Sequence, residues 1–213
     1  MRVGVIDYGV GNLGSVLRAL EEMRVAPVLV NRAADMHASD CLILPGVGNF
    51  ADCARLLDAG GWTNALRDEV LGNSRPLLGV CVGMQLLADF STEGTKAGQV
   101  SQGLGLIPGQ VQHLSTLGCT QRVPHMGWNG ITRTHTDEHL FNSIPDGTDF
   151  YFVHSYAFVP QDSADVLATT DYGVSVTAAV RRGHVWGTQF HPEKSSRAGL
   201  RLLRNFIEGS SAC

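Results

Sequence analysis

The sequence has no CxxC motif, no run of basic residues and no apolar stretch near the ~20 residues that span a bilayer. Its five cysteines are odd in number and widely spaced, which argues against a disulfide framework and a thiolate zinc site. With 16 basic and 20 acidic residues, the formal net charge is -4, which does not favour nucleic acid or an anionic membrane as partner. We therefore expect a small molecule or another protein as the partner.

The N-terminal segment also lacks the long apolar core and small-residue cleavage site of a signal peptide. We therefore expect a cytosolic protein. A chain of 213 residues, 44% of them hydrophobic, is long enough to bury one sizeable core. Since no internal repeat, low-complexity segment or linker divides it, we expect a single domain over residues 1–213.

The first half alternates short apolar runs with amphipathic stretches, a pattern typical of α/β folds. Strands separated by helices imply right-handed crossovers and a parallel sheet covered on both faces. Gly72 is placed to end a helix. We predict strands over 2–6, 27–30, 41–44 and 77–80, and helices over 12–23, 51–57 and 63–71.

The second half is richer in β-branched and aromatic residues, which favour strands. Because no linker separates the halves, we expect both to share one mixed, mostly parallel sheet flanked by helices. We predict strands over 149–159, 166–170, 174–180 and 185–190, a hairpin turn at 182–183, and an amphipathic helix over 196–207.

A nucleophile is predicted at Cys81, within the segment GVCVG at 79–83. An apolar strand leads into this segment, and a helical pattern follows it as far as Phe90. Glycines two residues before and after the centre are typical of a nucleophile elbow, because a Cβ there would collide as the chain reverses. At a helix start, backbone N–H groups and the helix dipole favour the thiolate. The alternative is a buried structural cysteine, as we expect for Cys41, Cys53, Cys119 and Cys213.

A base and a residue to orient it are available in His191 and Glu193. Pro192 ends the predicted strand and holds His191 extended. The imidazole would then leave the sheet at the carboxyl edge, where catalytic groups of parallel sheets collect. Glu193 is close enough in sequence to accept the other ring N–H. A histidine before proline is by itself more often structural, and His154 is a second candidate base.

The turn Gly46-Val47-Gly48 follows the predicted strand 41–44. Two glycines let backbone N–H groups point into the site, where an oxyanion forms when a thiolate attacks an amide carbonyl. Glycine-rich turns after strands also bind phosphate, and many bind nothing. No phosphate-binding or dinucleotide-binding signature supports the phosphate interpretation here.

Several motifs resemble those of a known family. GVCVGMQ at 79–85 and FHPEKS at 190–195 are similar to the nucleophile and His-Glu motifs of class I glutamine amidotransferases. Further segments resemble, in order and spacing, the glutaminase subunits of imidazole glycerol phosphate synthases in histidine biosynthesis. These segments are IDYGVGN (6–12), LPGVGNF (44–50), GLGLIPG (103–109), VPHMGWN (123–129), FVHSY (152–156) and ATTDYG (168–173).

The resemblance implies a class I glutamine amidotransferase fold and hydrolysis of L-glutamine to glutamate and ammonia, without a cofactor. It implies a heterodimer with a (β/α)8-barrel cyclase, which receives the ammonia through an internal tunnel and forms imidazole glycerol phosphate and AICAR from PRFAR. The implied residues are a triad of Cys81, His191 and Glu193; an oxyanion hole at Gly46, Val47, Gly48 and Val82; glutamine contacts at Gln85, Glu93, Ser155 and Tyr156; and a partner interface at Asn12, Tyr151 and Lys194.

Three other functions remain open. A paralogous glutaminase subunit that feeds ammonia to a sugar amidotransferase in surface-polysaccharide synthesis would carry the same motifs. A general cysteine hydrolase would act on other amides. A catalytically inactive binding module would be expected to lose the nucleophile or its base, and this sequence retains Cys81, His191 and Glu193.

A few conspicuous residues are given ordinary roles. His135 and His139, with Asp137 and Glu138 between them, have the i, i+4 spacing of a zinc pair. The segment resembles a solvated turn without a further ligand, so no metal is expected. Three more residues near the site are interpreted as structural, namely Met126 and Trp128 as packing residues and His125 as a hydrogen-bonded histidine.

Overall fold

The computed structural model describes residues 1–135 and 138–210. Its α-helices are α1 (Leu13–Glu22), α2 (Phe50–Ala59), α3 (Trp62–Arg67), α4 (Val82–Gln85) and α5 (Ser196–Gly209). A π-helical turn spans Asp68–Gly72, and 3-10 turns span Ala33–Ala38, His139–Phe141, Ser163–Asp165 and Pro192–Lys194. The strands are β1 (Val3–Ile6), β2 (Pro27–Val30), β3 (Cys41–Gly46), β4 (Leu77–Cys81), β5 (Phe90–Ser91), β6 (Ser101–Gln102), β7 (Gly109–His113), β8 (His125–Arg133), β9 (Asp149–His154), β10 (Tyr156–Pro160), β11 (Val166–Asp171), β12 (Ser175–Arg182) and β13 (Val185–Thr188).

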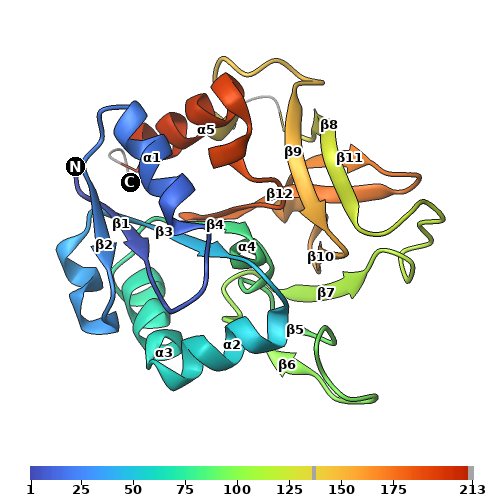
Figure 1. Cartoon of the computed structure of the whole chain (residues 1–213), viewed down its shortest axis with the longest axis horizontal. Coiled ribbons are helices and arrows are strands. Elements are labelled where there is room, and N and C mark those ends of the chain that lie inside the picture. Colours follow the sequence, from blue (N-terminus) through green and yellow to red (C-terminus); the bar gives the residue numbers. More distant parts are fainter. Residues whose placement is uncertain (136–137, 211–213) are drawn as a thin grey trace.

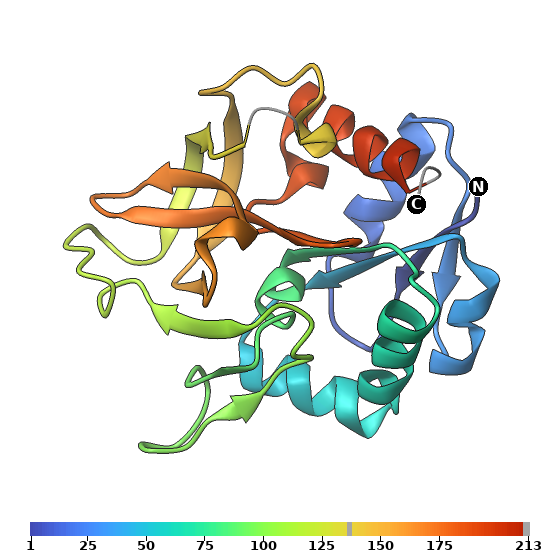
Figure 2. The same cartoon turned by 180° about the vertical axis from the view of Figure 1, so that it is seen from behind.

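A nine-stranded mixed sheet runs through the centre of the molecule, in the order β2-β1-β3-β4-β13-β12-β11-β8-β9 (Figure 1). Neighbours from β2 to β13 are parallel, and neighbours from β13 to β9 are antiparallel. Helices α1 and α5 lie on one face of the sheet and α2 and α3 on the other (Figures 1 and 2). The predicted α/β class and shared mixed sheet are confirmed.

The predicted elements of the first half are confirmed, with ends that differ by at most two residues. The central strands β3 and β4 are buried along their whole length, as expected of parallel strands that helices cover on both faces. The predicted helix 63–71 is α3 followed by the π-helical turn, which ends at Gly72 as predicted. The hairpin between β12 and β13 also lies where its turn was expected.

The second half contains a second sheet, β10-β7-β5-β6, which the sequence did not predict. The expected single strand 149–159 is wrong, because it breaks at Ser155. Strand β9 pairs with β8 in the main sheet, whereas β10 pairs with β7 in the smaller one. The N–H of Leu114 donates to the Ser155 carbonyl (2.9 Å), so the chain passes from one sheet to the other at this residue.

A sharp turn between β4 and α4 carries Cys81, whose φ of 57° and ψ of -112° are unusual for a residue with a side chain. A Cβ on Gly79 would lie 2.6 Å from the Gly83 carbonyl oxygen, and a Cβ on Gly83 would collide with the Leu44 carbonyl. Both glycines of the predicted elbow are therefore required by direct backbone contact.

The helix after the elbow is shorter than predicted. The expected continuation to Phe90 is wrong, since α4 ends at Gln85. Carbonyl groups that a longer helix would use internally accept bonds from a distant loop instead. Leu104 N donates to Leu86 O (2.7 Å), and Gly105 N donates to Ala88 O (3.0 Å). With one turn of aligned peptides, the helix dipole favours a thiolate less than the sequence pattern indicated.

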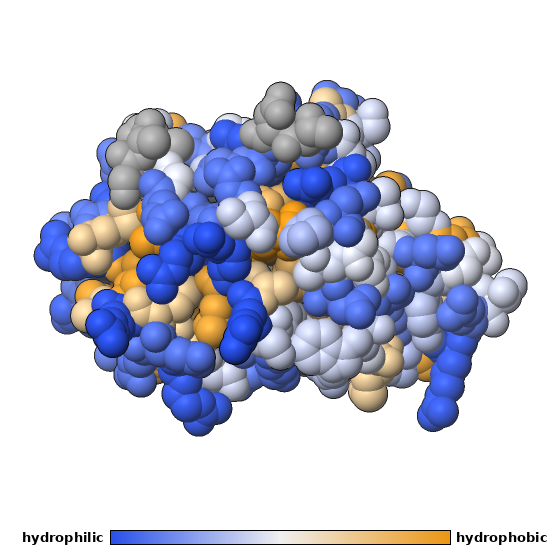
Figure 3. Space-filling view, turned by 90° about the horizontal axis from the view of Figure 1, so that it is seen from above, coloured by the Kyte–Doolittle hydropathy of each residue, from blue (hydrophilic) through white to orange (hydrophobic). Residues whose placement is uncertain are grey.

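Within residues 1–135 and 138–210, every helix is too short or too polar to cross a bilayer. The face seen from above in Figure 3 is mostly hydrophilic, and its apolar atoms gather in the left half between polar side chains. Polar groups therefore interrupt the apolar surface on this face.

We expect Gly83→Ala to destabilise the fold by about 2–3 kcal/mol, because the new methyl group meets the Leu44 carbonyl in a closely packed core. The matched control is Gly14→Ala in α1, where a Cβ would enter open space. The control should stay within about 1 kcal/mol of the parent, on the stabilising side. Urea unfolding measures both, and equal midpoints for the two variants would contradict the packing argument.

Candidate active site

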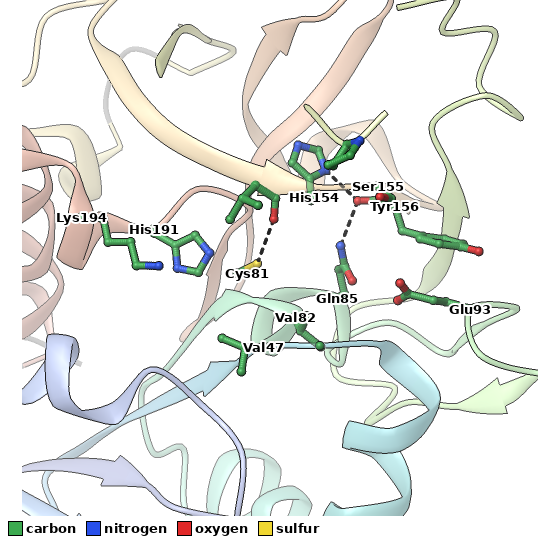
Figure 4. Close-up of a pocket in the computed structure, with 13 residues that line it drawn as sticks. Val47, Cys81, Val82, Gln85, Glu93, His154, Ser155, Tyr156, His191 and Lys194 are labelled. Atoms are coloured by element: carbon green, nitrogen blue, oxygen red, sulfur yellow. Dashed lines mark hydrogen bonds between the residues drawn. The ribbon is translucent and has the colours of Figure 1, made fainter. Parts of the chain in front are cut away.

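A cavity of about 370 Å³ lies beside the elbow. It is formed by the segments that follow β3, β4 and β13, together with the junction of β9 and β10. In Figure 4, His191 and Lys194 lie on one side of Cys81, and Gln85 and Glu93 lie on the other. The lining residues are Val47, Gly48, Cys81, Val82, Gln85, Glu93, Pro124, Val153, His154, Ser155, Tyr156, His191 and Lys194.

The structure brings the three residues of the predicted triad together. The imidazole of His191 lies beside Cys81 in the cavity (Figure 4), and interaction with this side chain raises the pKa of His191. On the other side of the ring, His191 Nδ1 lies 2.8 Å from Glu193 Oε1. A carboxylate only accepts, so Nδ1 carries the proton and Nε2 faces the thiol. This is the arrangement of nucleophile, base and orienting acid that the sequence predicts.

Opposing influences set the charge of His191. Burial is the largest single influence and lowers the pKa of this histidine. Interactions with Cys81 and Glu193 together outweigh it and raise the pKa to about 10. The imidazole therefore holds a proton when Cys81 is a thiolate, which is the state that a nucleophilic thiol requires.

Backbone and hydroxyl bonds fix the position of His191. The backbone N–H of His191 donates to the Tyr151 carbonyl in β9 (2.9 Å). The hydroxyl of Ser195 donates to the His191 carbonyl (2.6 Å) and accepts from Tyr151 N (3.0 Å). The residues after β13 are thus attached to β9, the edge strand of the main sheet, and this fixes the backbone of His191.

The predicted oxyanion residues divide into two groups. Val47, Gly48 and Val82 line the cavity. Gly46 is the buried last residue of β3, and a Cβ there would lie 2.6 Å from Gly83 N. Gly46 therefore allows the turn to pack against the elbow and lies behind the cavity lining.

All four residues predicted to bind glutamine line the cavity, namely Gln85, Glu93, Ser155 and Tyr156. Gln85 Nε2 donates to the Tyr156 carbonyl (2.9 Å). Glu93 Oε2 accepts from Phe50 N (2.9 Å). Burial raises the pKa of Glu93, and the bond from Phe50 offsets part of that rise. A cationic ligand group beside this carboxylate would offset more of the burial.

Sequence reasoning missed Gln189, which is fully buried under the nucleophile. Its Nε2 lies 3.9 Å from Cys81 Sγ, and its Oε1 accepts from Gln85 Nε2 (2.9 Å). Its position directly before the FHPEKS motif was the available signal. The second candidate base, His154, has both ring nitrogens in hydrogen bonds to other groups.

Two of the three predicted interface residues, Tyr151 and Lys194, lie close together. Lys194 Nζ is 6.0 Å from the centre of the Tyr151 ring. The ring of Trp128, on the paired strand β8, has its centre 6.1 Å from the centre of the Tyr151 ring. Trp128 is 53% exposed and Met126 is 61% exposed, so the interpretation of both as packing residues is wrong. Alternation along β8 turns them outward while His125 points inward. Asn12 directly precedes α1 and does not line the cavity.

The remaining predictions concern metals and thiols. Asp137 of the possible zinc pair lies outside the described residues, as does Cys213. Among residues 1–135 and 138–210, no group of three His, Cys, Asp or Glu side chains is arranged to hold a metal ion. The other cysteines, Cys41, Cys53 and Cys119, are free and buried.

The chain matches the family model described as glutamine amidotransferase class-I over residues 4–209, and it belongs to that family. It is 47% identical to "Imidazole glycerol phosphate synthase subunit HisH" of Moorella thermoacetica, over 97% of this chain and 94% of the relative. The protein of the same name from Rhodospirillum rubrum is 46% identical, over 97% of this chain and 98% of the relative. The predicted family is confirmed.

Solved structures support the fold. A structure described as "Crystal structure of glutamine amidotransferase" has a TM-score of 0.75 and 22% identity, and 98% of each chain is covered. The structure of PurLQS from Thermotoga maritima has a TM-score of 0.75 at 18% identity, also with 98% of each chain covered. The predicted class I glutamine amidotransferase fold is therefore confirmed.

We expect Glu193→Gln to lower the pKa of His191, because the substitution removes a charge that raises it. An NMR titration of the labelled imidazole measures this. A raised pKa in the folded state stabilises the fold below the unfolded value, near pH 6.5, and this contribution is lost as pH rises toward 10. The difference in urea stability between parent and variant should therefore shrink over that range. A difference that grows with pH would contradict the assigned ion pair.

Proposed function

We propose that the chain is the glutaminase subunit of an imidazole glycerol phosphate synthase. It hydrolyses L-glutamine to glutamate and ammonia, and the ammonia passes to a (β/α)8-barrel cyclase subunit that forms imidazole glycerol phosphate and AICAR from PRFAR. The observation that carries the proposal is Cys81 on a strained elbow in the same cavity as His191, whose Nδ1 lies 2.8 Å from Glu193 Oε1. The names of the relatives favour this partner over a sugar amidotransferase.

In the proposed reaction, the thiolate of Cys81 attacks the side-chain carbonyl carbon of glutamine. Backbone N–H groups of Val82 and of the turn at 46–48 stabilise the charge on the carbonyl oxygen. His191 donates its proton to the departing nitrogen, which leaves as ammonia. The imidazole then takes a proton from the water that hydrolyses the thioester. Glu193 keeps the ring in one orientation and supports its positive charge. No cofactor is required.

The far end of the cavity suits the amino-acid part of glutamine. Glu93 is half-buried there and accepts a single backbone bond, so its carboxylate can bind an α-ammonium group. Gln85, Ser155 and Tyr156 form the wall between this carboxylate and the nucleophile. A substrate bound at both Glu93 and Cys81 must carry its ammonium group and its amide at the two ends of a short side chain. Glutamine meets this requirement, whereas amides without such an ammonium group do not.

The proposed partner surface lies beside the cavity. Tyr151 and Lys194 were predicted to face the partner, and the exposed side chains of Trp128 and Met126 lie on the strand that pairs with β9. Exposed aromatic side chains at such a site are typical anchors of protein interfaces. Asn12, at the start of α1, extends the predicted interface to the neighbouring helix. Docking here would bring a barrel next to the site where ammonia is released.

The turn at 46–48 is the proposed point of control by the partner. Gly48 has a φ of 94°, a conformation that its lack of a side chain permits. The Cys53 thiol donates to the Val47 carbonyl (3.3 Å). Rotation of these peptides would change which N–H faces the oxyanion, and loss of one such donor costs about a hundredfold or more in rate.

Since four described cysteines are free thiols, we propose that the protein works in the reducing cytosol.

We expect Cys81→Ala to abolish glutamine hydrolysis while the fold remains intact, because no other thiol of residues 1–135 and 138–210 lines the cavity. His191→Asn should remove nearly all activity, and Glu193→Gln should remove less. Labelling with a glutamine-analogue electrophile should modify Cys81 and spare Cys53. Inactivation with the label on Cys53 and an unmodified Cys81 would overturn the assignment.

We expect the chain alone to hydrolyse glutamine slowly, and to become about a hundredfold or more faster with the cyclase barrel and its nucleotide ligand. Lys194→Ala should weaken this activation more than it weakens glutamine binding. Lys96 is exposed and lies outside the cavity lining, so Lys96→Ala is the matched control. Glutamine turnover is measured for the chain alone, with the barrel, and with barrel plus ligand. Comparable rates in all three would refute control by the partner.

A further inference from the structure

Two buried histidines behind the glutamine cavity have no part in the chemistry proposed above. His154 ends β9 and lines the cavity, and His125 begins the neighbouring strand β8. The atoms His125 Nδ1 and His154 Nε2 are 3.0 Å apart. The ring of His125 is stacked between those of Phe152 and Tyr172, at centroid distances of 4.7 and 4.0 Å. Its plane is therefore fixed independently of its hydrogen bonds.

The inner end of this pair fixes the direction of its hydrogen bonds. His154 Nδ1 lies 2.8 Å from the Tyr156 carbonyl oxygen, which also accepts from Gln85 Nε2 (2.9 Å). Because a carbonyl only accepts, His154 carries its proton on Nδ1. In the neutral ring Nε2 is then an acceptor, and the donor that reaches it is His125 Nδ1.

The outer end of the pair gives the same direction. His125 Nε2 lies 3.3 Å from Asn129 Nδ2, and the same amide nitrogen donates to the Asp171 carbonyl (2.8 Å). The Asn129 nitrogen thus faces both groups, and His125 Nε2 must accept. The row of hydrogen bonds thus ends at the Tyr156 carbonyl on one side and at the Asp171 carbonyl on the other. A second proton on either ring would point at another N–H group, at His125 Nδ1 or at Asn129 Nδ2.

The burial of both rings is consistent with one proton on each. It lowers the pKa of His154 to about 3 and the pKa of His125 to about 4, so both are neutral at physiological pH. In a buried network of this kind, each ring has one tautomer that satisfies all its neighbours.

We propose that His125 fixes the tautomer of His154, and that His154 through its Nδ1–H holds the Tyr156 carbonyl and so keeps the Ser155-Tyr156 segment in its glutamine-binding conformation. The two histidines are positioning residues, and the proposal rests on the proposed function. With the opposite tautomer, the Nδ1 lone pair would face the carbonyl and repel it. The displaced carbonyl would also release Gln85, which binds Gln189 beneath the nucleophile.

The first test uses His125→Phe, which keeps a flat ring between Phe152 and Tyr172 and removes the donor to His154. Nitrogen-15 NMR of labelled imidazoles reports the tautomers in the parent and the variant. We expect both rings of the parent to be neutral with the proton on Nδ1. In the variant the population of the Nε2–H form of His154 should rise, because only the Tyr156 carbonyl still favours the Nδ1–H form. An unchanged His154 tautomer in the variant would overturn the proposal.

The second test compares two substitutions of His154 in the complex with the cyclase barrel. The amide nitrogen of His154→Asn can replace Nδ1 and donate to Tyr156, whereas His154→Gln places its amide near the position of Nε2. We expect His154→Asn to keep a KM for glutamine near that of the parent. His154→Gln and His125→Phe should raise KM about tenfold, as expected for one lost hydrogen bond, with kcat changed less than about threefold.

Equal KM values for the asparagine and glutamine variants, or losses confined to kcat, would overturn the positioning role. A parent complex that does not hydrolyse glutamine would refute the proposed function instead. The NMR experiment needs no turnover, so the assignment of the two tautomers is tested in either case.

Discussion

The contact between Gly83 and the Leu44 carbonyl is the constraint on which the rest of the site depends. It lets the turn after β3 approach the elbow after β4 with no side chain between them. Gly46, at the end of β3, also needs to lack a side chain, because a Cβ there would meet Gly83 N. As a result, Val47 and Cys81 open into one cavity. Backbone packing in the sheet thus places Cys81 beside the turn whose N–H groups we propose to bind the oxyanion.

The histidines around the cavity differ in charge because their neighbours differ. His191 lies between the thiol of Cys81 and the carboxylate of Glu193, and interactions with both together outweigh its burial and favour the imidazolium. His154 lies between a carbonyl and the neutral ring of His125, and burial keeps it uncharged. One wall of the cavity therefore holds the ring that we propose to transfer protons, and the other holds the ring that we propose to keep its proton in place.

The sequence was most informative where structure is local. Continuous apolar runs located the parallel strands, and two glycines around Cys81 located the elbow. The sequence-based predictions failed where hydrogen bonds to distant backbone segments determine the secondary structure. The apolar residues after Gln85 have helical spacing, yet their carbonyls bond to the loop at 104–105. The run 149–159 has no breaking residue, and pairing with two different sheets divides it. Trp128 is as apolar as a core residue, and only its strand position shows that it faces outward.

The central claim is that glutamine is cleaved through a covalent bond to Cys81. Mass spectrometry of acid-quenched complex during turnover, followed by digestion, tests this most directly. We predict a glutamyl thioester on the peptide that contains Cys81, removed by hydroxylamine and absent from Cys81→Ala. Release of ammonia at the full rate with no adduct on Cys81, or an adduct on Cys41, Cys53 or Cys119, would contradict the mechanism.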